Sequence, residues 1–428
     1  MSSAITHATG FEHVCPECTA CFDSEPDLCP DCEHPRPPGG WESVHQSGHP
    51  YLGKMLEGRY LLDRYLGGGA SGKVYRAIDR KLQRPFALKI LKLGSAGEDA
   101  SEAVRRFDNE VDALSCIRNP HVINIFESLH LEEQTPAMLT EYIDGETLRE
   151  MVRGDNYLGV DSAVTLTHQI ANGLFEAHSR GIVHRDVKPA NIMVEKLPAS
   201  GSFARILDFG LVHIVDDVAQ TRGFWGTPLY AAPEQCLPDR EVSAASDIYS
   251  LGCVFFHCVT GRAPFVADSA RAIMRAQVDE PPPKASEVVD RPIPGAVDTL
   301  LADMLAKEPE ERPEDMKEII ERLEPMLGGG RHTTQTVVSR NDSEPGLSEG
   351  SMPVAPETQK GRPAEEAEAP SHLSIQSTET RIGVADTAPE RGRTAQLIRS
   401  VRPDDFDVSS AEEFVVGGLG ADGNSAAV

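Results

Sequence analysis

The chain has 428 residues, with 41 Lys and Arg against 67 Asp and Glu, so its formal net charge is −26. This length suggests two or three domains, or one large domain with appendages. Hydrophobic residues make up 40 % of the chain, which is enough for a sizeable core. The negative charge argues against nucleic acid as the main partner and against an anionic membrane surface, because both attract clustered Lys and Arg.

The sequence also argues against a membrane-spanning or secreted protein. Its most apolar stretch, residues 251–259, is shorter than the 18 or so apolar residues of a membrane span and contains His257. The N-terminus has neither the positive segment nor the apolar segment of a secretory signal. We therefore expect a cytoplasmic location.

The cysteines are concentrated at the N-terminus, with five of the nine in the first 32 residues. Two Cys-Pro-acid-Cys knuckles, Cys15 to Cys18 and Cys29 to Cys32, place four thiolates at the spacing of a tetrahedral Zn²⁺ site. Cys21 is surplus: it either replaces Cys18 or stays free. A redox-active thiol cluster is the alternative interpretation. Few large apolar residues surround the cluster, so this part of the chain needs the metal in order to fold.

Composition divides the chain into four expected parts. They are a zinc ribbon over 1–40, a linker over 41–56, a main domain over 57–327 and a tail over 328–428. The ribbon is acidic and is expected to bind protein rather than nucleic acid. Because it is separate in sequence, we expect the main domain to work without residues 1–56. The tail has 16 acidic and 9 basic residues and only two aromatic residues, so we expect it to be disordered.

The main domain changes character along its length. Its first third predicts strands over 60–62, 73–78 and 86–91, interrupted by a helix over 102–117. The part after Asp161 is mostly helical, with predicted helices over 162–179, 246–260, 296–305 and 313–323. The pattern indicates an α+β protein with a strand-rich lobe, a helical lobe and a cleft between them.

A glycine-rich motif runs from Gly67 through Gly69 and Gly72 to Val74. A dinucleotide-binding turn would need a helix to follow the motif, but a strand-like segment follows here. A P-loop would need Ser or Thr at the position of Val74. A glycine loop between two strands, which covers nucleotide phosphates with its backbone amides, fits every position. A plain glycine-rich hairpin remains the simplest alternative for the motif taken alone.

Two charged residues follow the glycine motif. Lys89 lies in an apolar strand, where a buried ammonium group needs a carboxylate or phosphate partner. Glu110, on the helix predicted over 102–117, is a candidate partner, although a solvated surface carboxylate would look the same in the sequence.

Three further motifs occur in order: His184-Arg185-Asp186-Val-Lys188-Pro-Ala-Asn191, then Asp208-Phe-Gly, then Gly226-Thr227-Pro to Ala-Pro-Glu234. With these motifs residues 57–327 resemble the protein kinase superfamily, and in particular the bacterial eukaryotic-like Ser/Thr kinases. The resemblance implies a bilobal kinase fold. It also implies transfer of the γ-phosphate of ATP to Ser or Thr hydroxyls of proteins, with autophosphorylation.

The resemblance also implies roles for individual residues. Asp186 is similar to the catalytic base, and Lys188 to the Lys that neutralises the transferred phosphoryl group. Lys89, paired with Glu110, would hold the α- and β-phosphates. Asn191 and Asp208 would bind Mg²⁺. The implied ATP-binding residues are Leu66, Gly67, Gly69, Gly72, Val74, Ala87, Lys89, Glu141 and Ile143.

The hinge and the activation segment are implied in the same way. Thr140 resembles the gatekeeper, and Glu141 and Ile143 would contact adenine through their backbones. Arg185, directly before Asp186, would make activity depend on phosphorylation of the segment 208–234. Within this segment Thr221 is the candidate phosphorylation site, and Thr227 would support the catalytic loop.

Two more residues match structural positions of the family. Asp247 resembles the buried Asp that braces the catalytic loop, and Arg312 resembles the partner of Glu234. The rival hypothesis is a pseudokinase scaffold that recruits partners through the ribbon and tail. Its signature would be loss of Lys89, Asp186 or Asp208, and all three are present.

Overall fold

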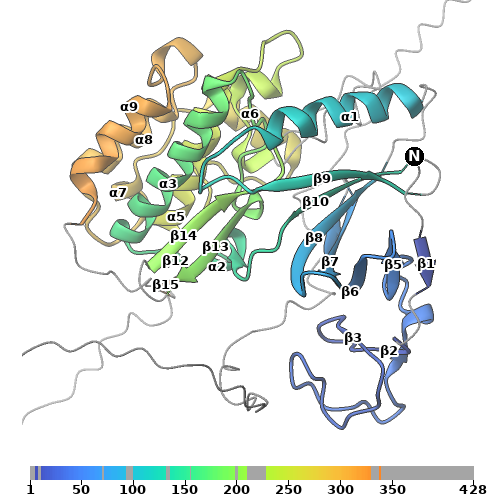
Figure 1. The fold of residues 1–428 in the computed structure, drawn as a ribbon. Coiled ribbons are helices and arrows are strands. Elements are labelled where there is room, and N and C mark those ends of the chain that lie inside the picture. Colours follow the sequence, from blue (N-terminus) through green and yellow to red (C-terminus); the bar gives the residue numbers. More distant parts are fainter. Residues whose placement is uncertain are drawn as a thin grey trace, which may run out of the picture. The chain divides into compact units, whose positions relative to one another are not determined.

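A computed structural model describes residues 5–7, 11–69, 72–92, 100–131, 135–154, 156–197, 201–209, 228–328 and 337–338. Its main part consists of a strand-rich N-lobe followed by a helical C-lobe (Figure 1). This order confirms the fold class expected from the sequence. Almost all of the tail expected over 328–428 lies outside the described residues.

The N-lobe is built on an antiparallel sheet of seven strands in the order β1-β5-β6-β7-β8-β10-β9. The strands are β1 (Ile5–His7), β5 (Lys54–Leu56), β6 (Tyr60–Gly69), β7 (Gly72–Asp79), β8 (Arg84–Leu91), β9 (Ile125–His130) and β10 (Pro136–Glu141). Helix α1 (Ala100–Ser115) packs against β9 and β10 (Figure 1). The three predicted strands and the first predicted helix are therefore present, each within a few residues of the expected limits except that β6 extends further.

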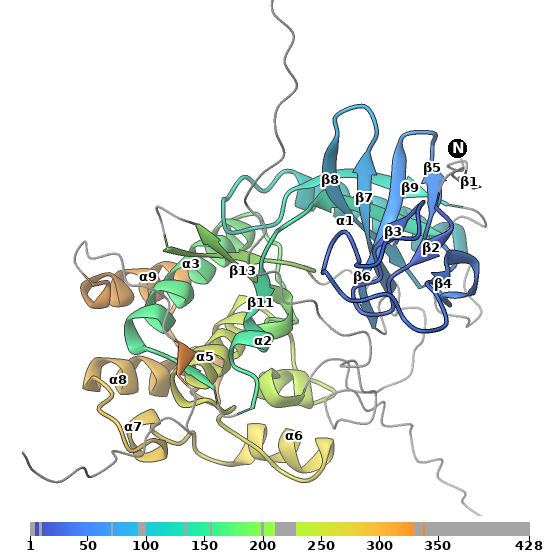
Figure 2. The ribbon, with the colours of Figure 1, turned by 90° about the horizontal axis from the view of Figure 1, so that it is seen from below.

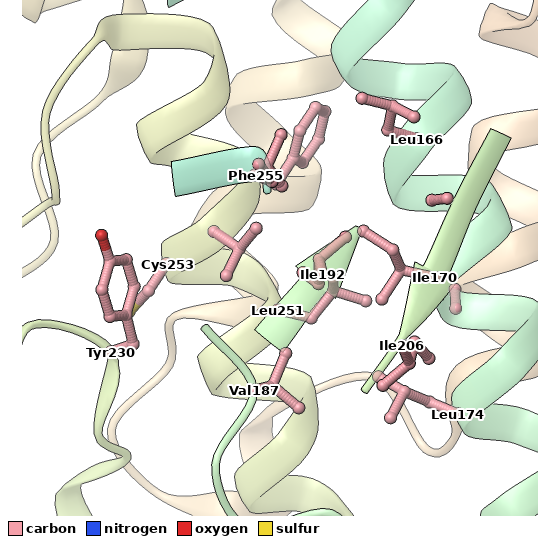
Figure 3. Close-up of a cluster of buried hydrophobic side chains, with 14 of the residues drawn as sticks. Leu166, Ile170, Leu174, Val187, Ile192, Ile206, Tyr230, Leu251, Cys253 and Phe255 are labelled. Atoms are coloured by element: carbon pink, nitrogen blue, oxygen red, sulfur yellow. The ribbon is translucent and has the colours of Figure 1, made fainter. Parts of the chain in front are cut away.

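The C-lobe core forms around two long helices, α3 (Val160–Ser179) and α5 (Ala244–Thr260). Apolar residues at helical spacing on α3 meet α5 and the hairpin β13 (Ile192–Leu197) and β14 (Gly201–Ile206). Figure 3 shows this contact, with Leu166, Ile170, Leu174, Val187, Ile192, Ile206, Leu251 and Phe255. Cys253 and Cys258 are also buried on α5, as small core residues.

The remaining helices complete the C-lobe. They are α2 (Leu148–Met151), α6 (Ala270–Asp279), α7 (Ala285–Val288), α8 (Gly295–Met304) and α9 (Met316–Leu323). Helix α9 starts three residues later than predicted, because the side chain of Asp315 accepts a hydrogen bond from the backbone amide of Glu318 and caps the helix there. Among the described residues, no helix is long and apolar enough to cross a membrane.

Short strands form four further pairings among the described residues. In the C-lobe, β11 (Glu146–Thr147) pairs with β13, and β12 (Tyr157–Leu158) pairs with β15 (Val337–Val338). In the N-terminal part, β2 (His13–Val14) pairs with both β3 (Cys21–Phe22) and β4 (Glu42–Ser43).

The cysteine-rich N-terminus packs against the N-lobe rather than standing apart (Figure 2). Val14, Val44 and Leu52 belong to the same buried cluster as Tyr75 and Leu88 of the N-lobe sheet. Strands β1 and β5, from the segments expected as ribbon and linker, lie in that sheet. Residues 1–56 therefore share a buried core with the main domain, which the sequence distance between the motifs does not reveal. That the main domain works without them stays a prediction.

Candidate active site and metal centre

The glycine motif forms the connection between β6 and β7. Gly67 pairs with Val74, and Gly69 pairs with Gly72. A Cβ atom on Gly72 would lie 2.1 Å from the carbonyl oxygen of Ile90, and its φ of +147° also favours glycine. This strand–loop–strand geometry is the one expected of a phosphate-covering loop, and it excludes the helix-opening turn of a dinucleotide fold.

Lys89 on β8 is buried, and its Nζ lies 2.7 Å from Oδ2 of Asp208. Burial alone would raise the pKa of Asp208, but the charge and hydrogen bond of Lys89 outweigh it and hold the pKa below its usual value. The two residues expected to hold phosphates and Mg²⁺ therefore lie next to each other in the structure.

Glu110 on α1 does not pair with Lys89 within the described part of the chain, which differs from the expected arrangement. Burial raises the pKa of Glu110 to about 7, and the nearby charge of Arg185 opposes this rise. Lys89 pairs with Asp208 instead, because that carboxylate lies closer to its ammonium group.

The catalytic loop brings together three of the predicted residues. Lys188 Nζ lies 3.1 Å from Asp186 Oδ2. The Asn191 side-chain amide donates to both the backbone carbonyl and Oδ2 of Asp186, at 2.9 Å each. Asp186 thus has a cation and an amide fixed on its carboxylate, and Oδ2 is the oxygen that both of them contact.

Asp247 on α5 binds the backbone of this loop. Its two carboxylate oxygens accept the backbone amides of His184 at 2.7 Å and Arg185 at 2.8 Å. Arg185 has a φ of +65°, which is costly for a residue with a Cβ atom. The contacts confirm the bracing role expected for Asp247 and help to hold the strained backbone before Asp186.

The hinge region follows β10. Thr140 is buried, and the backbone amide of Glu141 donates to the carbonyl of Asn124 at 3.0 Å. The Glu141 carboxylate forms an ion pair with Arg205 of β14 at 2.8 Å. Glu141 therefore ties the hinge to the C-lobe through its side chain, a contact that sequence analysis missed because Arg205 belongs to no motif.

The end of the activation segment is fixed by a buried ion pair. Arg312 Nη1 and Nη2 contact the two oxygens of Glu234 at 2.7 and 2.8 Å, which confirms the pairing expected from the sequence. Gln235 adds a hydrogen bond to the carbonyl of Arg185 at 2.7 Å. Thr221 and Thr227 lie outside the described residues.

The four predicted zinc ligands converge at one point. The sulfur atoms of Cys15, Cys18, Cys29 and Cys32 all lie within 4.8 Å of one another. The Cys15–Cys32 and Cys18–Cys29 sulfur distances are both 3.7 Å. A tetrahedron with Zn–S bonds of about 2.3 Å has sulfur–sulfur edges of about 3.8 Å. The residues therefore fit a tetrahedral zinc ion.

The two knuckles share one backbone geometry. The carbonyl of Cys15 accepts the amide of Thr19 at 2.9 Å, and the carbonyl of Cys29 accepts the amide of Glu33 at 3.0 Å. Thr19 and Glu33 both have positive φ, at 56° and 60°. Equivalent turns aim the two thiol pairs at a common centre.

Cys21 is not part of this centre. It lies on β3 and packs against the N-lobe cluster, and burial raises the pKa of its thiol to about 12. This resolves the open question about the surplus cysteine in favour of a thiol that stays free.

Similarity to known proteins identifies the class of protein to which this chain belongs. Residues 60–322 match the family model of the protein kinase domain. The chain belongs to the protein kinase domain family.

Named relatives narrow the class further. The chain is 33 % identical over 288 residues to a probable serine/threonine-protein kinase PknB of Bifidobacterium longum, over 64 % of this chain and 41 % of the relative. It is 33 % identical over 270 residues to the serine/threonine-protein kinase pkn3 of Myxococcus xanthus, over 61 % and 49 %. It is 33 % identical over 297 residues to the serine/threonine-protein kinase PknD of Mycobacterium tuberculosis, over 69 % and 43 %. The chain spans less than half the length of these relatives.

Proposed function

We propose that this protein is a Ser/Thr protein kinase that transfers the γ-phosphate of ATP to hydroxyl groups of protein substrates and of itself. The observation that carries the proposal is the cluster around the Asp186 carboxylate, where Lys188 and Asn191 each place a nitrogen atom within 3.1 Å of Oδ2. The named Ser/Thr kinases among its relatives support the choice of substrate hydroxyl.

In the proposed mechanism Asp186 accepts the proton of the substrate hydroxyl as the hydroxyl oxygen attacks the γ-phosphorus. The bond between the γ-phosphorus and the oxygen that bridges it to the β-phosphate breaks, and ADP leaves. The Asn191 amide orients the Asp186 carboxylate, and Lys188 lies beside the same oxygen, where its charge offsets that of the transferred phosphoryl group. Lys89 contacts the α- and β-phosphates. Asn191 and Asp208 would supply hard oxygen ligands to Mg²⁺, which would offset phosphate charge when bound.

The nucleotide would lie beneath the β6–β7 hairpin. Backbone amides of Gly67, Gly69 and Gly72 would contact its phosphates. The apolar side chains of Leu66, Val74 and Ala87 would enclose the adenine, and the backbones of Glu141 and Ile143 would bind its edge. We propose that Lys89 forms an ion pair with Glu110 in the catalytically active arrangement.

We further propose that Cys15, Cys18, Cys29 and Cys32 bind one Zn²⁺ that stabilises the ribbon. All nine cysteines are free thiols in the structure, which fits a reducing compartment such as the cytoplasm. The ribbon and the tail are candidate binding sites for a protein partner. A pseudokinase scaffold is not supported, since Lys89, Asp186 and Asp208 are all present.

The test uses the purified full chain with Mg²⁺, labelled ATP and a Ser/Thr-containing protein substrate. Asp186→Asn keeps the side-chain shape and removes the base, so phosphoryl transfer to substrate and to itself should fall by at least about 10²-fold. Asp23→Asn, the same change at an exposed ribbon position, is the matched control. Transfer at the wild-type rate by Asp186→Asn would exclude the proposed role.

A further inference from the structure

The second zinc knuckle, Cys29 to Cys32, contacts strands β6 and β7, which carry the glycine motif. Asp31, between Cys29 and Cys32, forms ion pairs with Arg64 on β6 and with Arg76 on β7, the second at 3.3 Å. Arg64 and Arg76 are register partners at the base of the β6–β7 hairpin. One ribbon carboxylate therefore bridges both strands of the nucleotide-covering hairpin.

These arginines are poorly accessible to water. Their side chains are 12 % and 18 % exposed. Arg76 also pairs with Asp63 at 2.7 Å, whereas Asp31 is the only carboxylate recorded in contact with Arg64 among the described residues. Two arginines and two carboxylates thus form a neutral group, and removal of Asp31 leaves the half-buried Arg64 without its carboxylate partner.

The first knuckle, Cys15 to Cys18, is followed by residues that contact the same stretch of β6. Ala20 forms a bridge with Arg64, and the hydroxyl of Thr19 donates to the carbonyl of Tyr65 at 2.6 Å. The pairing of β6 with β7 shifts register on both sides of this stretch, between Leu62 and Arg64 and between Tyr65 and Gly67. The ribbon therefore binds β6 where its own sheet pairing is irregular, directly before the glycine loop.

The electrostatic surroundings of Arg76 include the hinge. Burial opposes its positive charge, but Asp63 and Tyr142 together raise its pKa above the usual value. Tyr142 lies between Glu141 and Ile143, the residues proposed to bind adenine. The charge of Arg76 therefore interacts with the hinge as well as with the hairpin.

We propose that Asp31 is a positioning residue for ATP: through Arg64 and Arg76 it holds the glycine hairpin in the conformation that binds nucleotide. The ribbon therefore acts as a built-in positive regulator of the ATP site. The inference rests on the proposed kinase function where it is tested by measuring KM and kcat. Where it is tested by measuring the Kd of a nucleotide analogue, it rests on nucleotide binding alone.

The experiment compares full-length wild type, Asp31→Asn, Asp31→Glu and the control Asp23→Asn. We expect Asp31→Asn to keep one zinc per chain, to raise KM for ATP and Kd for a fluorescent ATP analogue about 3–10-fold, and to leave kcat within about twofold. Asp31→Glu should restore part of the affinity, and Asp23→Asn should match wild type. A merely structural residue would lower thermal stability without this split between KM and kcat.

A double-mutant cycle tests the route of the effect. Arg64→Met should weaken nucleotide binding on its own, and Asp31→Asn should weaken binding less in the Arg64→Met background than in wild type, because only the contact with Arg76 is then left to lose. If Asp31→Asn is too unstable to study alone, the single variant Arg64→Met tests whether loss of the ion pair weakens nucleotide binding.

Three results would overturn the inference. They are an unchanged Kd in Asp31→Asn with zinc retained, an equal loss in Asp23→Asn, or loss of zinc from Asp31→Asn, which would assign the residue to the ribbon itself. If wild type binds the nucleotide analogue but transfers no phosphate, the proposed function fails while the binding measurements still test Asp31.

Discussion

Glu234 and Arg312 meet in a two-point ion pair in which the side chains are 3 % and 0 % exposed. They are 78 residues apart in the chain, and they join the end of the activation segment to the loop before α9. Ser246 and the carbonyls of Ala245, Ala306 and Lys307 satisfy the remaining polar atoms. The pair therefore fixes the end of the activation segment to the C-lobe.

Replacing Arg312 with Met should lower the free energy of unfolding by about 3–5 kcal/mol, because Glu234 would remain buried without a counter-charge. Urea denaturation of the full chain measures this. Arg240→Met, which breaks the exposed pair with Glu308, is the control and should cost no more than about 1 kcal/mol. Equal losses in the two variants would contradict the assigned importance of burial.

Asp247→Asn should lower kcat by about 10–100-fold while leaving the nucleotide Kd nearly unchanged. The amide has one oxygen for the two backbone amides that the carboxylate now accepts, so the loop carrying Asp186 shifts, and small misplacements of a base are costly. Steady-state kinetics at saturating ATP and analogue titration provide the two values. A wild-type kcat in this variant would show that the catalytic loop keeps its conformation without the Asp247 carboxylate.

Freshly purified, reduced protein should contain one zinc per chain by elemental analysis. Cys29→Ser removes a ligand and should abolish stoichiometric zinc, whereas Cys21→Ala, at the cysteine that faces the N-lobe core, should retain it. Zinc loss from both variants, or from neither, would contradict the assigned ligand set.

His257 on α5 makes the C-lobe sensitive to acid. Burial lowers the pKa of His257 from 6.5 to about 4, against the hydrogen bond to the backbone of Val152, and its Nδ1 lies 2.8 Å from the Tyr230 hydroxyl. Between these two pH values the unfolded chain binds more protons than the folded one. The stability due to neutral His257 is therefore complete above pH 6.5 and falls by about 3 kcal/mol as the pH drops to 4.

Urea denaturation at pH 7 and at pH 4.5 tests this dependence. The loss of stability between the two values should be smaller in His257→Gln than in wild type, and this difference cancels the contributions of other titrating groups. An equal loss in both proteins would contradict the assignment to His257.

Thr221 remains a sequence-based prediction. Thr221→Ala should lower activity toward an added substrate, because a phosphate there would neutralise Arg185. Mass spectrometry of active protein should find the phosphate. Full activity of Thr221→Ala, with no phosphate between residues 211 and 227, would show that the segment orders itself without modification.

The sequence predicted what is local. The glycine hairpin and both zinc knuckles are each encoded within about ten residues, so their spacing indicated them. The role of the catalytic loop, which is equally short, was implied by the family resemblance. The partners of Asp247 and Arg312 were predicted because the family resemblance supplied them. The contacts of Asp31 were not predicted, since they join single residues more than 30 positions apart and belong to no motif.

The same limit explains the two differences found at the N-terminus and at Lys89. The ribbon looked independent because its few apolar residues, such as Val14 and Val44, show no periodicity that would predict a partner surface. Lys89 was expected beside Glu110, but whether it contacts that residue or Asp208 depends on where α1 lies relative to the sheet. Helix position is set by packing over the whole lobe, which sequence pattern does not encode.

The shared core between ribbon and sheet has a consequence for synthesis of the chain. The four thiols lie within 18 residues and are complete once Cys32 has been made, so the metal can be captured early. The apolar side of the ribbon, however, packs on residues as late as Leu139. During synthesis the ribbon would therefore wait, with Val14 and Val44 uncovered, until about a hundred more residues follow, and it would then serve as a preformed surface on which the N-lobe sheet assembles.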